Sequence, residues 1–172
     1  IFYLSTIFMC MKKFKKIWKD VSLTLESIDL FYEQLSYNLN DKDAKRMFDL
    51  RGYFQRGIFE GAFEKNNLEK KYYSEALIYC YKQYIISGKM DISKEKIDQW
   101  AMECYSATED GLKYDDILKK MYVKIINSGK KTYKEGAGGL CVDAMLKIWK
   151  DKSIQIESPI KKNVKNFFQK LF

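Results

Sequence analysis

The three arginines are the first residues of this chain that could carry specific binding chemistry. Arg46, Arg51 and Arg56 follow one another at a spacing of five residues, in a 172-residue chain that otherwise relies on 28 lysines. A guanidinium binds a carboxylate or phosphate through two parallel hydrogen bonds, whereas lysine acts as a point charge. Five residues turn a helix by about 140°, so the three cannot share one face. They are candidate interaction residues. The alternative is a set of separate salt bridges with Asp49, Glu60 and Glu64.

Catalytic chemistry has few candidates. The chain contains no histidine, which removes the commonest general base and excludes Ser-His-Asp and Cys-His nucleophile arrangements. Glu60 with Glu64, and Asp115 with Asp116, are the carboxylate pairs that could hold a metal or exchange a proton. Such pairs more often form the solvated face of a helix. We therefore predict that the protein is not an enzyme and has neither a metal nor another cofactor.

The cysteines indicate a reducing compartment. The four are Cys10, Cys80, Cys104 and Cys141. They are widely spaced, and no Cys-x-x-Cys pair or histidine completes a zinc set. The last three fall among apolar residues of expected helices, which is typical of buried thiols. We expect a cytoplasmic protein, with membrane association as an open alternative.

The net charge of +8 is concentrated at the two ends of the chain. Residues 1–19 contain five lysines and no acid, and residues 161–172 contain four lysines and no acid. The 141 residues between them carry 22 basic and 23 acidic side chains. Lysine bias is also typical of an AT-rich genome, so charge alone does not define a site. The candidate interaction residues at the two ends are Lys12, Lys13, Lys15, Lys16, Lys161, Lys162, Lys165, Phe167 and Phe168.

The most regular hydrophobic pattern lies at the start of the chain. Apolar residues recur at intervals of three and four from Leu4 to Leu39, which predicts one long amphipathic helix. Ile17 and Phe31 widen the apolar stripe beyond the seam of a two-stranded coiled coil. A wide face favours packing in a bundle, and we expect this helix to be central. Self-association through the stripe is the alternative.

Residues 1–11 form an apolar extension that is followed at once by lysines. This stretch is too short to span a bilayer, which takes about 20 residues. Three interpretations compete: the remnant of a membrane anchor or signal peptide, a monotopic anchor, and read-through ahead of a start at Met11. The charges of a signal peptide normally precede its apolar run, whereas here they follow it. Read-through or a plain extension of the first helix is therefore favoured.

Local signals predict the next three helices. Asn40 or Asp41 can cap the second helix. The third is expected over residues 68–87, with Gly88 as its C-cap. The fourth is expected to start near Ser93 and to end at the turn that follows its apolar stripe.

Similar signals predict the rest of the chain. A fifth helix is expected from Leu112 to about Ser128, ending at Gly129. Thr132 and Glu135 then form a capping box for a sixth.

The last predicted helix is basic and amphipathic. Ser158 followed by Pro159 places a cap before a proline at the first helical position, and the helix covers residues 158–172. Together these elements predict an all-α fold, a bundle of six or seven helices. The bundle domain occupies residues 12–157, between the apolar extension and the C-terminal helix.

Tyrosines and lysines interleave in the third helix, a composition that could stack bases and hold phosphates. The five tyrosines are Tyr72, Tyr73, Tyr79, Tyr81 and Tyr84. An ordinary buried stripe explains most of them and leaves only Tyr79 and Tyr81 outside it. Core packing is the favoured interpretation.

The functional prediction follows from the missing catalytic groups and the amphipathic ends. We expect a non-enzymatic helical interaction protein that acts through contacts with a protein partner or through self-assembly. One alternative is peripheral association with an anionic membrane through the basic amphipathic termini. Another is sequence-independent nucleic-acid binding through the same lysines.

Overall fold

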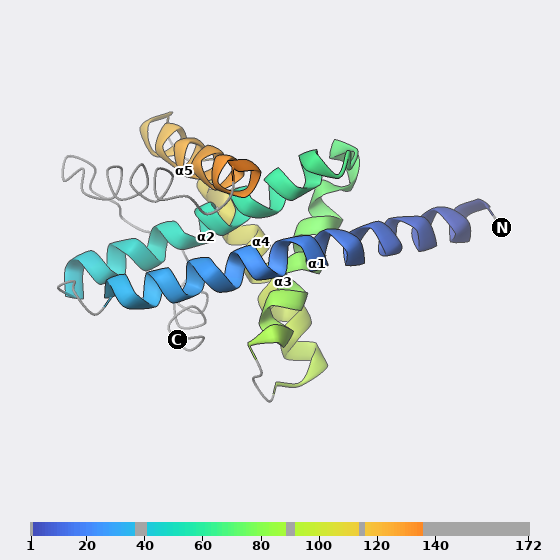
Figure 1. Ribbon diagram of the computed structural model, residues 1–172, viewed down its shortest axis with the longest axis horizontal. Helices are drawn as coiled ribbons and strands as arrows, with labels where there is room; N and C mark the ends of the chain where they lie inside the picture. The colour runs from blue at the N-terminus through green and yellow to red at the C-terminus, as the bar shows by residue number, and fades with distance from the viewer. Residues whose placement is uncertain (1, 37–40, 89–91, 114–115, 136–172) are drawn as a thin grey trace.

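The computed structural model describes residues 2–36, 41–88, 92–113 and 116–135. Within these residues all the regular structure is helical, which confirms the all-α prediction. The elements, shown in Figure 1, are α1 (Phe2–Ser36), α2 (Asp41–Lys65), the short 3-10 helix η1 (Lys70–Tyr72), α3 (Tyr73–Ser87), α4 (Lys94–Gly111) and α5 (Asp116–Glu135). The predicted C-terminal helix over residues 158–172 lies outside the described residues.

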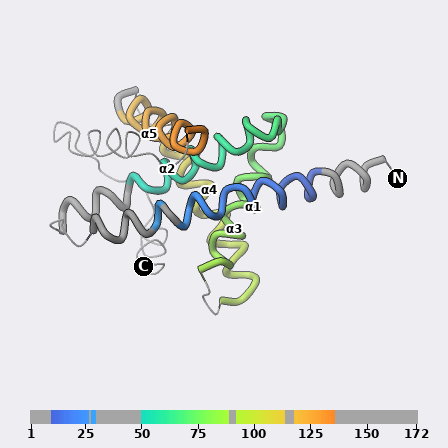
Figure 2. The backbone as a smooth tube through the Cα atoms, in the orientation of Figure 1, coloured from blue at the N-terminus to red at the C-terminus, as the bar shows by residue number. Residues whose placement is uncertain are grey.

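Helix α2 lies at the centre of the bundle. It contacts α1, α3, α4 and α5, and the backbone tube in Figure 2 passes between them. From Leu50 to Phe63 every residue is buried except Glu60, which is half-buried. A helix that is buried around most of its circumference lies in the interior, even though this one also carries the buried polar residues Arg51, Gln55 and Arg56. The expectation that the first helix is central was therefore wrong.

Helix α1 runs antiparallel to α2 and also contacts α3. The direction follows from two contacts, Lys13 with Asn67 and Asp29 with Arg51. The buried stripe of α1 consists of Phe14, Ile17, Val21, Leu25 and Ile28. None of the five is more than 5% exposed, and burying each stabilises the fold by about 1.5–3 kcal/mol. This part of the apolar stripe packs inside the chain itself.

Glycines bring α2 and α5 into backbone contact. The two helices run in the same direction, and a Cβ added to Gly57 would lie 2.0 Å from the carbonyl oxygen of Ile126. A Cβ added to Gly129 would lie 2.2 Å from the carbonyl oxygen of Phe54. Only glycine permits so close an approach. At Gly61 the fit is looser, with a nearest distance of 3.1 Å.

The same contact explains where the local signals failed. Gly129 does not end the fifth helix, because α5 continues to Glu135. Thr132 is not a cap either: it is buried in α5, and its hydroxyl donates to the carbonyl oxygen of Ser128 at 2.9 Å. Both predictions were wrong for the same reason. Gly129 serves the close packing of α5 against α2 and does not form a turn, so the helix continues through Thr132.

Other helix ends follow their local signals. The fourth helix begins next to Ser93 as predicted, and the Ser93 side chain caps it by accepting a hydrogen bond from the Lys96 backbone N–H. Helix α2 ends at a left-handed Asn67 with φ 50°. The N–H of Leu68 then donates to the carbonyl oxygen of Phe63 at 2.9 Å. This pairing is a Schellman motif, which satisfies carbonyls left open at a helix end.

We predict that the α2–α5 contact makes Gly57→Ala and Gly129→Ala destabilising. Alanine gains about 1 kcal/mol over glycine in an exposed helix, but the overlap with backbone atoms should outweigh this gain. The free energy of unfolding, from urea titration, should fall by about 1–3 kcal/mol.

Gly61→Ala, at the looser contact, should change the free energy of unfolding little. Asn127→Ala, at an exposed α5 position, controls for helix propensity. If Gly129→Ala stabilised the protein as an exposed site would, the helices would not be in contact there.

Candidate functional site

Arg51 is buried where α1, α2 and α3 meet. Its Nη2 donates to the Asp29 carboxylate and, at 3.1 Å, to the Tyr84 hydroxyl. That hydroxyl donates to the second Asp29 oxygen at 2.8 Å. Arg51 is only 3% exposed. Burial raises the pKa of the Asp29 carboxyl, while Arg51 and the Tyr84 hydrogen bond act against this. The arginine holds three helices together from inside the bundle.

Arg56 makes a second buried cluster, between α2 and α4. Its Nε donates to Glu60 at 2.9 Å, and its Nη1 donates to the Thr108 hydroxyl at 3.1 Å. Its Nη2 pairs with Glu109 at 2.6 Å. The side chain is 7% exposed. The predicted salt bridge with Glu60 is confirmed, and the other two partners come from a helix 52 residues further along the chain.

Two lysines of α5 form ion pairs with Glu60 and Glu64, the carboxylate pair of α2. The Lys130 ammonium pairs with Glu60 at 2.8 Å and with Glu64 at 3.0 Å, and Lys134 pairs with Glu64 at 2.5 Å. The hydrogen bond from Lys134 lowers the pKa of the Glu64 carboxyl, with Lys130 acting in the same direction. A carboxylate held by ammonium groups is a weak base. Within the described residues, no group of three or more His, Cys, Asp or Glu side chains could hold a metal.

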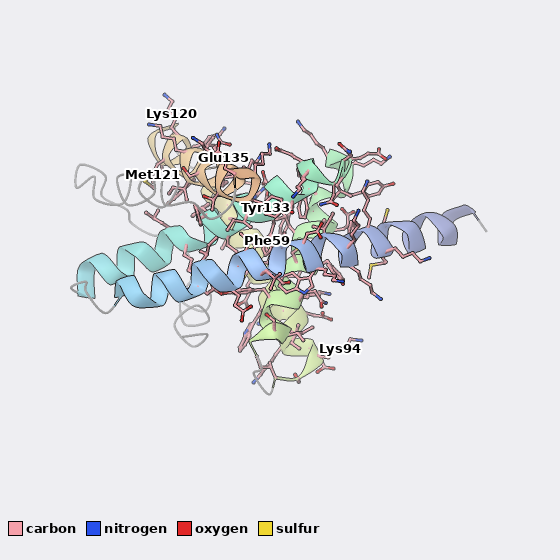
Figure 3. The ribbon with its side chains drawn as sticks, viewed as in Figure 1. Phe59, Lys94, Lys120, Met121, Tyr133 and Glu135 are labelled. Carbon is pink, nitrogen blue, oxygen red and sulfur yellow. The ribbon has the colours of Figure 1, made fainter. Side chains whose placement is uncertain are left out.

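The buried aromatic and thiol groups belong to the core. Tyr81 is buried, and its ring packs edge-on against the Phe59 ring with 5.4 Å between the ring centroids. The prediction that Tyr81 lies outside the buried stripe was therefore wrong. Figure 3 shows Phe59 in the middle of the molecule. Cys80 and Cys104 are buried as predicted, and burial raises the pKa of both thiols. Such thiols are inert. Cys10 is half-buried, and Cys141 lies outside the described residues.

The outer face of α1 is the candidate interaction surface, which we call the lysine face. It consists of the exposed residues Lys12, Lys15, Lys16 and Lys19. Their spacing of three, four and seven places all four on one side of the helix. That side is opposite the buried stripe. Lys13, the other predicted lysine of this segment, points elsewhere: it is half-buried, and its ammonium donates to the Asn67 carbonyl oxygen at 2.7 Å.

Charge is segregated along α1. All five lysines of the helix lie at or before residue 19, where the helix carries no acid. From residue 20 to its end the helix carries acids and no base. The acids are Asp20, Glu26, Asp29 and Glu33. The N-terminal half is therefore basic and the C-terminal half acidic.

The sequence pattern does not single out Asp29, Thr108, Glu109 or Lys130. The one signal for Asp29 is its place directly after Ile28, a carboxylate at the edge of a buried stripe. Nothing local marks the other three, whose partners lie on distant helices.

The remaining predicted residues lie outside the part of the chain whose side chains the structure describes. They are Arg46, Lys161, Lys162, Lys165, Phe167 and Phe168. Among the described residues, no helix has both the length and the apolar character needed to cross a bilayer. The chain matches no protein-family model, no curated protein and no solved structure.

We predict that Arg56→Met lowers the free energy of unfolding by about 2–3 kcal/mol. Removing one partner of a buried pair typically costs about 3–5 kcal/mol. The cost should be smaller here because Lys130 still neutralises Glu60 and because Glu109 can turn to water. Urea unfolding measures the change, and Lys131→Met, at an exposed position, is the control. A loss for Arg56→Met no larger than that control would contradict a buried cluster.

We also predict a pH dependence that originates at Glu64. Its pKa lies below the ordinary value of 4.5, so between the two values the unfolded chain binds more protons than the folded one. The stabilisation is complete above the unfolded pKa, and it is lost as the pH falls through the folded pKa. Glu64→Gln should therefore destabilise the protein at neutral pH, and the difference from wild type should shrink in acid.

Urea unfolding at a series of pH values measures this difference, with the mostly exposed Glu135→Gln as the control. A difference that stays constant into acid would show that the Glu64 charge plays no part.

Proposed function

We propose that the protein is a non-enzymatic helical interaction protein that binds an acidic partner through the lysine face of α1. One observation carries this proposal: four exposed lysines share one side of a helix in a 19-residue stretch without an acid. Clustered cations of one sign raise the local concentration of an anionic partner and speed its association. The face is opposite the packed stripe, so a partner reaches it without disturbing the core.

The internal ion pairs support a non-enzymatic role. Arg51, Arg56, Glu60 and Glu64 were the residues best suited to binding or proton transfer, and each is paired with a side chain of another helix. A pair between helices fixes their relative position. These four residues therefore act in the fold, and the exposed lysines are left as the candidate binding groups.

Self-assembly is less well supported than binding to an acidic partner. Residues of the apolar stripe between Phe14 and Ile28 are already used in the core. Among the described residues, the exposed large apolar side chains are spread over four helices: Met11 and Leu23 on α1, Ile86 on α3, Met102 on α4 and Val123 on α5. Single exposed apolar residues are common on protein surfaces. The C-terminal segment, with Lys161 and its neighbours, stays a predicted second basic surface.

We predict that replacing the lysine face weakens binding to an immobilised polyanion. A quadruple variant, with Lys12, Lys15, Lys16 and Lys19 each changed to Gln, should elute from heparin at clearly lower salt than wild type. Ion release makes such binding fall steeply with salt.

The matched control changes four other exposed lysines to Gln: Lys94, Lys96, Lys119 and Lys120. Lys94 and Lys120 are labelled in Figure 3 and belong to α4 and α5, not to α1. The two variants have the same net charge, so the control should elute close to wild type. Equal elution of both variants would refute a localised binding surface.

A further inference from the structure

We infer that the acidic partner is an anionic lipid bilayer, which the N-terminal end of α1 meets obliquely. The first turns of the helix enter the headgroup region, and the lysine face binds the lipid phosphates. This inference rests on the proposed function and names its partner. Two features of α1 beyond the lysines carry it, namely the composition of its first turns and the boundary between its basic and acidic halves.

The first turns of α1 have the composition of a segment that enters lipid. Residues 2–11 contain eight apolar residues, two hydroxyl residues and no charge, and all belong to the helix. A helix satisfies its backbone hydrogen bonds internally, so it can enter a medium without water. The lysines follow directly, where an inserted helix would pass the phosphates.

The length of the uncharged first turns also suits a membrane interface. At a rise of 1.5 Å per residue, residues 2–9 span roughly 12 Å. Interfacial helices bury their apolar side about 5–10 Å into the boundary between headgroups and acyl chains. Residues 2–9 can therefore lie within the interfacial layer.

The charge boundary sets the orientation. Asp20 and Glu26 are exposed beyond the last lysine, and an anionic surface repels them. Attraction to such a surface decays within a Debye length, about 8–10 Å at physiological salt. The basic half of α1 therefore faces the lipid, while the acidic half and the bundle stay away from it. A helix lying flat on the membrane would instead bring these acids to the surface.

Nucleic acid fits this surface less well. It would contact the lysines, but it would leave the uncharged first turns without a partner. Only a bilayer offers an anionic layer directly above an apolar one, in the same order as the residues of α1.

The test is cosedimentation of the full chain with vesicles of phosphatidylcholine alone and of phosphatidylcholine with phosphatidylserine. Wild type should bind only the anionic vesicles, and salt should weaken the binding. The key variant is the double substitution Leu4→Ser and Phe8→Ser. Both positions continue the helical register of Lys12, Lys15 and Lys19 toward the N-terminus.

The double variant should bind about tenfold more weakly, with an unchanged melting temperature. The control is Leu23→Ser, whose leucine lies four residues beyond Lys19 and is 71% exposed. Because the acidic half of α1 stays off the membrane, Leu23→Ser should bind as wild type does.

Four outcomes would overturn the inference. Wild-type-like binding of the double variant would show that the lysines act without insertion. An equal loss for Leu23→Ser would show that the helix lies flat. Binding to duplex DNA or heparin without binding to anionic vesicles would exclude lipid while leaving the proposed function intact, whereas failure to bind any polyanion would exclude both.

Discussion

The backbone contact between α2 and α5 is the constraint on which the rest of the structure depends. Gly57 and Gly129 leave no room for a side chain between the helices, so α2 must lie in the interior along this stretch. Once α2 is interior, Arg51 and Arg56 are interior too, and a buried charge needs a partner. The neighbouring helices supply those partners. Asp29 reaches Arg51 from α1, and Glu109 reaches Arg56 from α4.

We expect these buried ion pairs to contribute more to specificity than to net stability. Two charges taken from water lose hydration that their attraction only partly returns. An apolar interior can slide by one helical turn at low cost, whereas a guanidinium with three partners in fixed positions cannot. The lysines of α5 act similarly on the other side, where Lys130 lies between Glu60 and Glu64. The interior is therefore fixed in register by charge.

Features that depend on neighbouring residues could be predicted from the sequence, whereas features that depend on distant ones could not. The buried stripe of α1 follows from its spacing, and the Ser93 cap follows from one residue type. The prediction that Gly129 ends a helix was wrong because the sequence does not distinguish a glycine at a helix end from a glycine that allows a second helix to pack closely. Arg51 and Arg56 were recognised as unusual, but their partners lie on other helices, so their burial could not be predicted. The lysine face was visible as a run of charge, and only the helix geometry separates Lys13 from the other four.

The parallel pairing of α2 with α5 has a consequence for how the chain folds during synthesis. Glu60 and Lys130 are 70 residues apart, so the ribosome must add all of α3 and α4 before α5 can cover the central helix. At about 5–20 residues per second this takes roughly 4–14 s. During that time one side of α2 has only the earlier helices as cover, and contacts between residues so far apart in sequence also form slowly. The nascent chain thus exposes for seconds the side of α2 that α5 later covers, a period in which a chaperone would have the opportunity to bind it.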